Sequence, residues 1–332
     1  MKKIRFAIYG CGMIANIHAG AINEIKNAVL VGAGDIKEEF AARFAEKYGI
    51  KTFPDYDAMI HSDEIDAICI CTPSGTHASL AIQAINCGKN VVLEKPMAIT
   101  VAECDQIVEA CEKSTGKLMV ISQLRTVPDV KRAKEIIASG ALGKITICDV
   151  HMKYYRTPEY FKGSWKGTKK MDGGGALMNQ GIHGVDLLQY ICGPIKNIQS
   201  CVRTLVHDIE VEDTAVAIAE FENGAIGVIE ATTSVYPGFN RVIEVCGSRG
   251  SLVLKEGRLE KVLLADGEIH ETVVVNDSDD ANDPTKVKTE GHKNQISGFV
   301  DMLLGKANPE ICDQYEGRKA VEIIERIYKS SN

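Results

Sequence analysis

The sequence has little positive charge, no long hydrophobic run and no cysteines at metal-site spacing. Its 332 residues contain 38 Lys and Arg against 45 Asp and Glu, for a formal net charge of -7. An acidic chain without basic runs argues against nucleic-acid binding and against a polybasic membrane anchor. Because no stretch approaches the roughly 18 uninterrupted apolar residues of a membrane span, a transmembrane helix is excluded as well.

The eleven cysteines form no CxxC pair. Cys69 and Cys71 alternate with isoleucines in an apparent buried strand, which favours reduced core thiols over disulfides or a metal site. Behind the charged start, the apolar stretch of residues 6–9 ends in a glycine turn and is too short for a signal-peptide core. We therefore expect a cytoplasmic protein that holds no metal.

The first third of the chain alternates short apolar runs with helical patterns. The runs lie at 3–9, 28–33, 51–53, 67–71, 90–94 and 118–121. Helical patterns follow the first run to about residue 24 and then cover 37–48, 55–61, 76–87 and 100–115. This alternation predicts an α/β domain with a doubly wound parallel sheet over residues 1–123.

After about residue 144 the pattern changes to longer, alternating strands joined by short turns. These strands are expected at 145–154, 197–206, 213–221, 225–233, 240–247, 251–255 and 259–264. They predict an open, mainly antiparallel sheet, interrupted by a glycine-led helix at 175–191. The acidic stretch 276–291 is expected to be an exposed loop, with helices near 292–304 and 314–330. Residues 124–332 would then form a second, α+β domain for substrate binding and oligomerisation, with the C-terminal helix packing back.

A glycine-rich turn follows the first strand and opens a helix. It has the pattern G-x-G-x-x-A and comprises Gly10, Cys11, Gly12, Met13, Ile14 and Ala15. Small residues let backbone N–H groups and the helix N-terminus approach a pyrophosphate, as in a Rossmann domain. Asp35, at the expected end of the second strand, can accept hydrogen bonds from the adenosine ribose. Its carboxylate would repel a 2′-phosphate and no arginine follows it, so NAD is favoured over NADP.

Two further elements carry residue types suited to proton transfer. The strand at 90–93 runs into Glu94 and Lys95, at the edge where such sheets bind ligands, so both are expected at the cofactor and Lys95 also at the substrate. Asn179 and His183 lie four residues apart and should share one helix face behind three glycines. His183 suits general acid–base work, and Asn179 can orient it or bind a substrate hydroxyl. Taken singly, Lys95 could equally be a surface lysine and His183 a hydrogen-bonded core residue.

The loop before the glycine run contains the single tryptophan. Trp165 could cover a sugar ring or the nicotinamide, and Arg156 could bind a carboxylate or phosphate. The alternative for Trp165 is a packed side chain in an ordered loop.

These motifs occur together in an order that closely resembles the glucose–fructose oxidoreductase/inositol dehydrogenase/rhizopine-catabolism (Gfo/Idh/MocA) family. The resemblance rests on the glycine turn, CTPSGTH at 71–77, EKP at 94–96 and the GGG…NxxxHxxD helix, and it covers essentially the whole chain. It implies that Lys95 and His183 are the catalytic lysine and histidine. It also implies that the cofactor is bordered by Thr72, Pro73, His77 and Gln123 and that the substrate is contacted by Arg125.

The resemblance implies an NAD-dependent oxidoreductase acting on a secondary alcohol of a sugar, sugar derivative or polyol, in a homodimer or homotetramer. Many family members have Asp where this chain has Asn179, and an amide cannot serve as a base. Proton transfer would then fall to His183 and Lys95. Two alternatives stay open from the sequence: a glycosidase that recycles NAD through a 3-keto sugar, and a non-catalytic regulator that binds NAD or a sugar.

Overall fold

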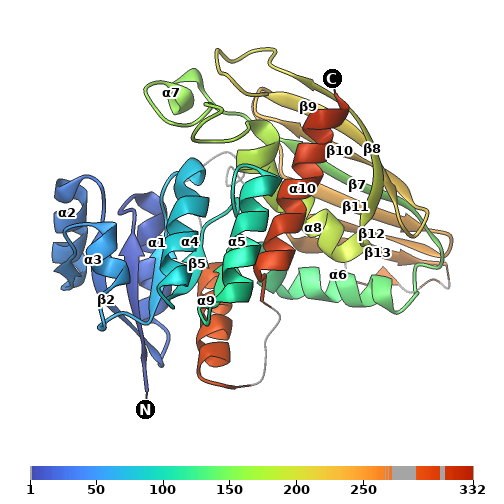
Figure 1. Ribbon diagram of the computed structural model, residues 1–332. Helices are drawn as coiled ribbons and strands as arrows, with labels where there is room; N and C mark the ends of the chain where they lie inside the picture. The colour runs from blue at the N-terminus through green and yellow to red at the C-terminus, as the bar shows by residue number, and fades with distance from the viewer. Residues whose placement is uncertain (1, 266, 268, 271–288, 307–310, 332) are drawn as a thin grey trace. The chain divides into compact units, whose positions relative to one another are not determined.

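The computed structural model describes residues 2–265, 267, 269–270, 289–306 and 311–331 (Figure 1). These residues group into two compact units. The first comprises Met1–Gln123 and Val287–Arg318, and the second comprises Leu124–Lys286 and Lys319–Asn332. The segment 287–318 therefore groups with the N-terminal unit, whereas the sequence analysis placed it in the second domain. Most of the acidic stretch expected as an exposed loop lies outside the described residues, and its last residues, 289–291, begin a helix.

The first unit is built on a parallel six-stranded sheet with strand order β3-β2-β1-β4-β5-β6. Its strands are β1 (Ile4–Tyr9), β2 (Ala28–Gly34), β3 (Lys51–Thr52), β4 (Ala67–Ile70), β5 (Asn90–Leu93) and β6 (Leu118–Val120). Its helices are α1 (Met13–Asn23), α2 (Glu38–Tyr48), α3 (Tyr56–Ile60), α4 (His77–Asn86), α5 (Val101–Lys113) and α9 (Thr289–Leu303). Short 3-10 turns cover Ser74–Thr76 and Gln123–Thr126. Order, direction and helical crossovers confirm the predicted doubly wound sheet.

The core of this unit is completed by a helix from far along the chain. Phe6 and Ile8 of β1 and Ile22 of α1 are fully buried, and Phe299 of α9 belongs to the same cluster. The apolar run of β1 explains its central place, because a parallel sheet covered on both faces requires near-continuous hydrophobic strands. Helix α9 therefore serves as a structural part of the dinucleotide-binding fold.

The second unit is built on an eight-stranded sheet with strand order β14-β13-β12-β11-β7-β10-β9-β8. Its strands are β7 (Ile145–Lys153), β8 (Ile195–Arg203), β9 (Thr214–Phe221), β10 (Ile226–Thr232), β11 (Val242–Gly247), β12 (Gly250–Lys255), β13 (Arg258–Leu264) and β14 (Ile269–His270). Only the β7–β10 pair is parallel among the paired strands described. The predicted open, mainly antiparallel sheet is confirmed.

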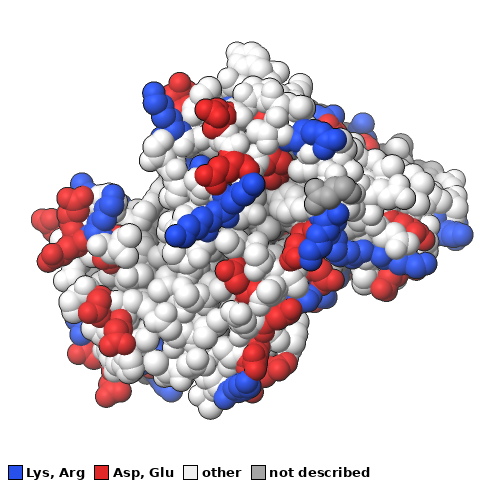
Figure 2. Space-filling model, turned by 45° about the horizontal axis from the view of Figure 1, so that its top comes forward, with Lys and Arg blue, Asp and Glu red and all other residues white. Residues whose placement is uncertain are grey.

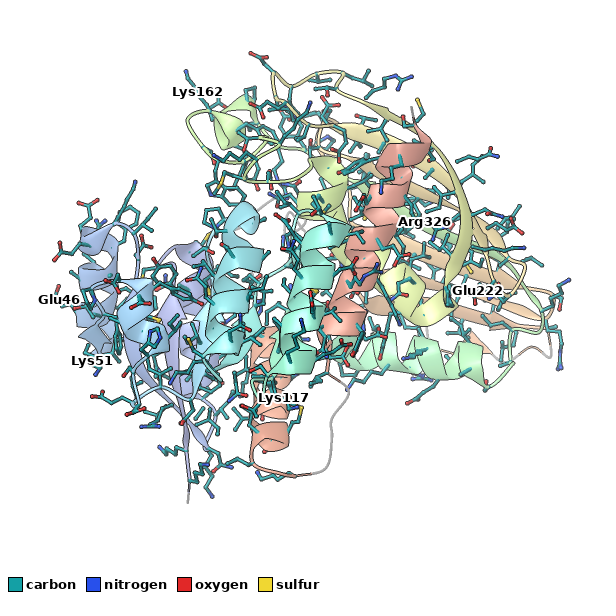
Figure 3. All side chains as sticks on the ribbon, in the orientation of Figure 1. Glu46, Lys51, Lys117, Lys162, Glu222 and Arg326 are labelled. Carbon is teal, nitrogen blue, oxygen red and sulfur yellow. The ribbon has the colours of Figure 1, made fainter. Side chains whose placement is uncertain are left out.

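The helices described for the second unit lie on one face of its sheet and leave the other face without a helix (Figure 1). They are α6 (Pro128–Ala138), α7 (Pro158–Phe161), a π-helix (Ala176–Gly181) that continues into α8 (Ile182–Cys192), and most of α10 (Gln314–Ser330). Helix α8 packs on β7, whose buried residues alternate with outward-facing ones (Figure 1). Arg326 of α10, labelled in Figure 3, donates to the carbonyl oxygens of Ile195 and Lys196 at 2.8 and 2.7 Å and so fastens α10 to β8.

Two helices were not anticipated. The sequence predicts no element at residues 124–144, where α6 forms, and it predicts a loop in the region of α7. Helix α6 starts with a proline in its first turn and buries only Val130 and Ala133, so its apolar stripe is narrow and its periodic signal weak.

None of the described helices is long and apolar enough to cross a membrane. On the face shown in Figure 2, the described Lys and Arg side chains are interspersed with Asp and Glu and do not gather into one basic surface.

Candidate active site

The glycine turn between β1 and α1 is held by its neighbours in the first unit. Gly10 adopts φ +92°, and a Cβ there would lie 2.7 Å from the carbonyl oxygen of Cys71, so only glycine fits. Asp35 follows β2 and accepts the backbone N–H of Cys11 at 2.7 Å and that of Lys37 at 2.9 Å, one on each carboxylate oxygen. Each oxygen retains a second lone pair, so the carboxylate can also accept ribose hydroxyls.

The N-terminus of α1 fits a dinucleotide pyrophosphate. Gly12 is the N-cap, and no side chain caps the helix, so its first N–H groups have no side-chain partner among the described residues. A Cβ built on Gly12 would meet nothing within 4 Å among those residues. Met13 is exposed and Ile14 is half-buried. Open space, unpaired N–H groups and the positive end of the helix dipole together suit a bound anion.

Next to this turn, the loops after β4 and β5 are joined by a buried histidine. His77 places Nδ1 2.7 Å from the carbonyl oxygen of Pro96 and Nε2 2.9 Å from that of Thr72. Burial lowers the pKa of His77, and the two carbonyl contacts only partly oppose this. Thr72 also pairs with Thr76 through their hydroxyls at 2.7 Å, and Pro73 is half-buried beside it. His77, predicted to bind the cofactor, therefore has both ring nitrogens engaged by backbone and holds the two loops together.

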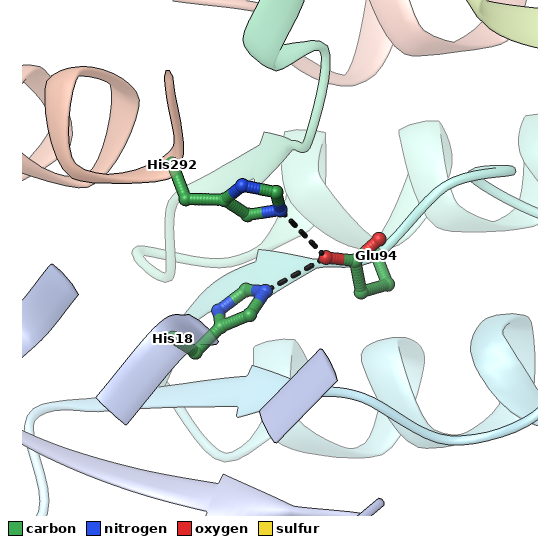
Figure 4. A group of neighbouring side chains, drawn as sticks. All are labelled: His18, Glu94 and His292. Atoms are coloured by element: carbon green, nitrogen blue, oxygen red, sulfur yellow. Dashed lines mark hydrogen bonds and ion pairs between the residues drawn. The ribbon is translucent and has the colours of Figure 1, made fainter. Parts of the chain in front are cut away.

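Glu94 and Lys95 follow β5 at the carboxyl edge of the sheet. Glu94 is buried, and its Oε1 lies 2.7 Å from Nε2 of His18 and 3.3 Å from Nε2 of His292 (Figure 4). Its Oε2 accepts the backbone N–H of Lys95 at 3.1 Å. Lys95 is half-buried, and its peptide bond to Pro96 is cis. Glu94, predicted at the cofactor, thus has both carboxylate oxygens engaged inside the first unit.

The charge state of Glu94 follows from two opposing effects. Burial by itself favours the protonated acid, but the hydrogen bonds from His18 and His292 outweigh it and hold the pKa of Glu94 well below its ordinary value. Neither histidine is predicted from the sequence. The available signal was a histidine on an otherwise apolar helix face, such as His18 on α1, which by itself indicates only a buried polar residue.

In the second unit, the glycine run before the π-helix is required by close contacts. A Cβ on Gly175 would lie 1.7 Å from the carbonyl oxygen of Glu212. The Glu212 carboxylate accepts the N–H groups of Gly175 and Leu177 and the hydroxyl of Tyr328, each at 2.8 Å. Burial raises the pKa of Glu212, although these hydrogen bonds oppose the rise. Glu212, also missed from the sequence, therefore anchors the element that carries Asn179.

Asn179 and His183 are both half-buried, the first in the π-helix and the second in α8. The side-chain amide of Asn179 donates to Asp172 at 2.6 Å, and Asp172 also accepts the backbone N–H of Gly167 at 2.8 Å. Asp172 is buried, so it fixes the orientation of the Asn179 amide. A carboxylate is therefore present beside position 179, on the preceding loop.

Three other predicted residues lie in defined surroundings. Arg125 forms two hydrogen bonds with Asp186, at 2.9 and 2.6 Å, in a buried ion pair of the second unit. Gln123 belongs to the first unit, where the start of α9 packs on it through Gly291. Trp165 is half-buried in the loop after α7, and its carbonyl oxygen accepts the Thr168 hydroxyl.

Cationic and aromatic side chains gather around Tyr160 in the second unit. The guanidinium of Arg156 lies 5.6 Å from the centre of the Tyr160 ring, and Nζ of Lys166 lies 3.7 Å from it. Arg156 is buried, and Gln180 donates to the Tyr160 hydroxyl at 3.1 Å. We call Arg156, Tyr160, Lys166 and Gln180 the Tyr160 cluster, and its chemistry suits an anionic group attached to a ring.

Comparison with known proteins gives a consistent result. Residues 4–122 match the model of an oxidoreductase family with an NAD-binding Rossmann fold, and residues 130–253 match the GFO/IDH/MocA C-terminal domain. The glucose-6-phosphate 3-dehydrogenase of Bacillus subtilis is 30% identical, covering 80% of this chain and 78% of that protein. The myo-inositol 2-dehydrogenase of Thermotoga maritima is 28% identical, over 79% and 78% respectively.

A solved structure matches nearly the whole chain. The WlbA dehydrogenase of Bordetella pertussis, in complex with NADH and UDP-GlcNAcA, has a TM-score of 0.89 and 31% sequence identity. The match covers 99% of this chain and 97% of that one.

Proposed function

Because the chain belongs to the Gfo/Idh/MocA family of NAD-binding sugar and polyol dehydrogenases, we propose that it oxidises a secondary alcohol of a sugar derivative with NAD. The observation that carries this proposal is the arrangement of the first unit. It has an uncapped helix N-terminus at Gly12, and a lysine held by a buried carboxylate follows β5. In a parallel sheet both lie at the edge formed by the carboxyl ends of the strands, where dinucleotides bind.

The residues divide into binding and proton-handling roles. The backbone of residues 10–14 would hold the pyrophosphate, and Asp35 the adenosine ribose. Bound NAD supplies the hydride acceptor. Nζ of Lys95 or the imidazole of His183 would take the proton of the substrate hydroxyl, since the Asn179 amide cannot accept it. Asn179, held by Asp172, would orient a substrate hydroxyl.

The Tyr160 cluster supports a substrate with an anionic group. Two cationic side chains on one aromatic ring, with Trp165 on the same loop, suit a sugar that carries a carboxylate or phosphate. Among the similar proteins, one is named for a sugar phosphate and another was solved with a nucleotide sugar. We therefore assign cofactor binding to the first unit and substrate binding to the second, and rank acidic and phosphorylated sugars above neutral polyols.

We also propose that the protein is a homodimer or homotetramer. The open sheet face carries Val216 and Ile218 on β9 and Ile226 on β10, all exposed. Exposed apolar residues that share one sheet face mark an association surface. A second copy of the chain would cover this surface.

The test is NADH formation followed by absorbance with a panel of sugar phosphates, UDP-sugars, hexuronates, hexoses, inositols and aryl glycosides. Accumulation of NADH with one class supports the proposal, and Lys95→Met should abolish it while NAD still binds. Lys117→Met, at an exposed lysine of the same unit, is the matched control.

Three outcomes would contradict the proposal. Glycoside cleavage with retained cofactor and no NADH accumulation would establish an internally recycled cofactor instead. NAD binding without any turnover would indicate a regulator. Absence of NAD binding would refute the interpretation of the glycine turn.

A further inference from the structure

The first unit contains a buried cluster of two histidines and one glutamate that the proposed reaction does not use directly. His18 comes from α1, Glu94 follows β5 and His292 comes from α9 (Figure 4). Their side chains have little or no contact with solvent, with residue exposures of 0%, 6% and 1%. We call these three residues the His–Glu–His cluster. It joins the pyrophosphate-binding helix, the strand that leads to Lys95, and a helix from the C-terminal part of the chain.

The hydrogen bonds determine which atoms carry protons. An ionised carboxylate only accepts, so Nε2 of both histidines must donate to Oε1 of Glu94. A neutral imidazole has one N–H, and the Nδ1 atoms of both rings are buried and have no partner among the described residues. Burial lowers the pKa of His18, in agreement with a neutral ring, despite the opposing effect of Glu94. The cluster is therefore one carboxylate that accepts one N–H from each of two imidazole rings.

Histidine and glutamate are also metal ligands, but this geometry is that of hydrogen bonds. Nε2 of His18 lies 2.7 Å from Oε1, closer than the roughly 3.3 Å between two ligands that a tetrahedral zinc holds at about 2.0 Å each. Nε2 of His292 lies 3.3 Å from Oε1, a distance that suits either arrangement. The unpartnered nitrogens are the Nδ1 atoms, and Figure 4 shows them turned away from Glu94. A metal held between the three side chains would leave them unused.

The second oxygen of Glu94 connects the cluster to Lys95. Oε2 accepts the Lys95 backbone N–H at 3.1 Å, while Oε1 is held by the histidines. A carboxylate with three N–H donors cannot rotate without breaking at least one hydrogen bond, and in a buried environment the donor that is left has no water to replace the carboxylate. The direction in which the chain leaves β5 at Lys95 is therefore coupled to both histidines.

We propose that His18 and His292 are positioning residues that act through Glu94 to set the backbone of Lys95 at the active site. The proposal rests on the proposed function for the role of Lys95. It assigns to α9, which lies far along the chain, a part in placing the proton-transfer group. It follows that position 292 requires a side chain with an N–H donor, and that an apolar side chain of similar size does not suffice.

The direct readout is the amide resonance of Lys95 in protein labelled with 15N-lysine, assigned by its loss in Lys95→Arg. In His18→Leu and His292→Leu we expect this resonance to move upfield and exchange faster, because the acceptor is no longer held. His292→Gln retains an N–H donor and should restore the wild-type position. His61→Leu, at an exposed histidine of the same unit, should leave it unchanged.

The kinetic readout separates positioning from general destabilisation. With the substrate identified by the panel, His292→Leu should lower kcat about tenfold or more, since small displacements of a reacting group are costly. The dissociation constant for NAD should stay at the wild-type value, and His292→Gln should recover most of kcat. A role confined to stability would change the melting temperature and leave kcat of the folded enzyme unchanged.

Several results would overturn the inference. These are an unmoved Lys95 amide in the leucine variants, equal kcat for the leucine and glutamine variants, or stoichiometric zinc in the purified protein. If the leucine variants do not fold, His18→Met and His292→Met replace them, and an unmoved amide there has the same meaning. Full turnover by Lys95→Arg would instead contradict the proton-transfer role proposed for Lys95, and the amide measurement would still decide the coupling.

Discussion

At the scale of single residues, buried carboxylates hold the predicted site residues in place. Glu94 accepts a hydrogen bond from the backbone of Lys95, Asp172 accepts one from the amide of Asn179, and Glu212 accepts one from the glycine run at Gly175. Each is buried, and each accepts hydrogen bonds from several N–H or O–H groups. Buried carboxylates persist only where such donors replace water, and their removal leaves those donors unpaired. These carboxylates therefore hold the half-buried Lys95 and Asn179, to which we assign proton transfer and substrate binding, and the glycine run beside Asn179.

Asp35 gives the first prediction. Asp35→Ala removes the acceptor of the Cys11 N–H together with the proposed ribose contact. We expect the dissociation constant for NAD to rise about tenfold or more, because a lost charged hydrogen bond is worth roughly 1.5–3 kcal/mol. Calorimetric titration with NAD and NADP measures this, and the preference for NAD over NADP should shrink. Asp63→Ala, at an exposed position, is the control. Unchanged NAD affinity would rule out the ribose contact.

Buried His18 gives a prediction for pH. The pKa of His18 is lowered in the folded protein, chiefly by burial, from about 6.5 in the unfolded chain. Its neutral form thus contributes stability above about pH 6.5 that is lost on acidification, because the unfolded chain takes up the proton first. The free energy of unfolding should therefore fall between about pH 7.5 and 5.5, by up to about 1.4 kcal/mol per pH unit for this histidine.

Urea unfolding across this pH range provides the measurement. His18→Gln should reduce the slope of the unfolding free energy against pH by the equivalent of one proton, whereas His61→Gln, at an exposed histidine, should not change it. If wild type and both variants gave the same slope, the pKa of His18 would not be lowered on folding.

At the scale of elements, two glycine-dependent helix starts shape the site, for different reasons. Gly175 is required because backbone of Glu212 occupies the space of a side chain. At Gly12 the space is open within the chain, so glycine is needed only if a ligand comes close. Conformation therefore does not explain Gly12, while cofactor approach does.

Gly10 and Gly12 lie in the same turn, but only Gly10 is required by its conformation and contacts, so we expect their alanine variants to behave in opposite ways. Gly12→Ala should fold normally and lose NAD affinity strongly, because its φ of −77° suits alanine and the added methyl faces the proposed pyrophosphate position. Gly10→Ala should lose about 1–3 kcal/mol of stability, owing to φ +92° and the contact with Cys71. Thermal unfolding and NAD titration of both variants provide the test. Normal NAD binding by Gly12→Ala would place the pyrophosphate elsewhere.

At the scale of the whole molecule, the C-terminal part of the chain contributes a helix to each of the two units. Helix α9 completes the core of the first unit, and α10 supplies Tyr328 to the glycine run of the second. Each unit therefore depends on residues from the C-terminal part of the sequence, and truncation before α9 would remove Phe299 and expose the part of the first unit's core that it covers.

The open sheet face gives the last prediction. Ile218 is 58% exposed at the middle of β9. Ile218→Lys should convert the proposed oligomer to smaller species, because a charge would be buried at the contact. Sedimentation velocity measures the change, and NAD affinity should persist. Leu205→Lys, at an exposed loop position of the same unit, is the control. If wild-type protein sediments as a monomer, the association surface does not exist.

Most of the architecture was predictable because it is encoded locally. The alternation of apolar runs and helices, the glycine turn and the change to period-two strands each lie within a few residues of one another. Family and cofactor type followed from motifs in order along the chain. The helix at 128–138 was not predicted, because only a narrow stripe of it is buried.

Local sequence by itself determined the doubly wound sheet, the dinucleotide-binding turn and the residue types available for proton transfer. Tertiary structure alone decided that Glu94 and His77 face inward, that Arg125 pairs with Asp186, and that α9 belongs to the first unit. The His–Glu–His cluster joins positions 18, 94 and 292, which no periodicity relates. The reason is physical: whether a polar side chain binds a ligand or satisfies a buried partner depends on which distant donors the fold brings within about 3 Å.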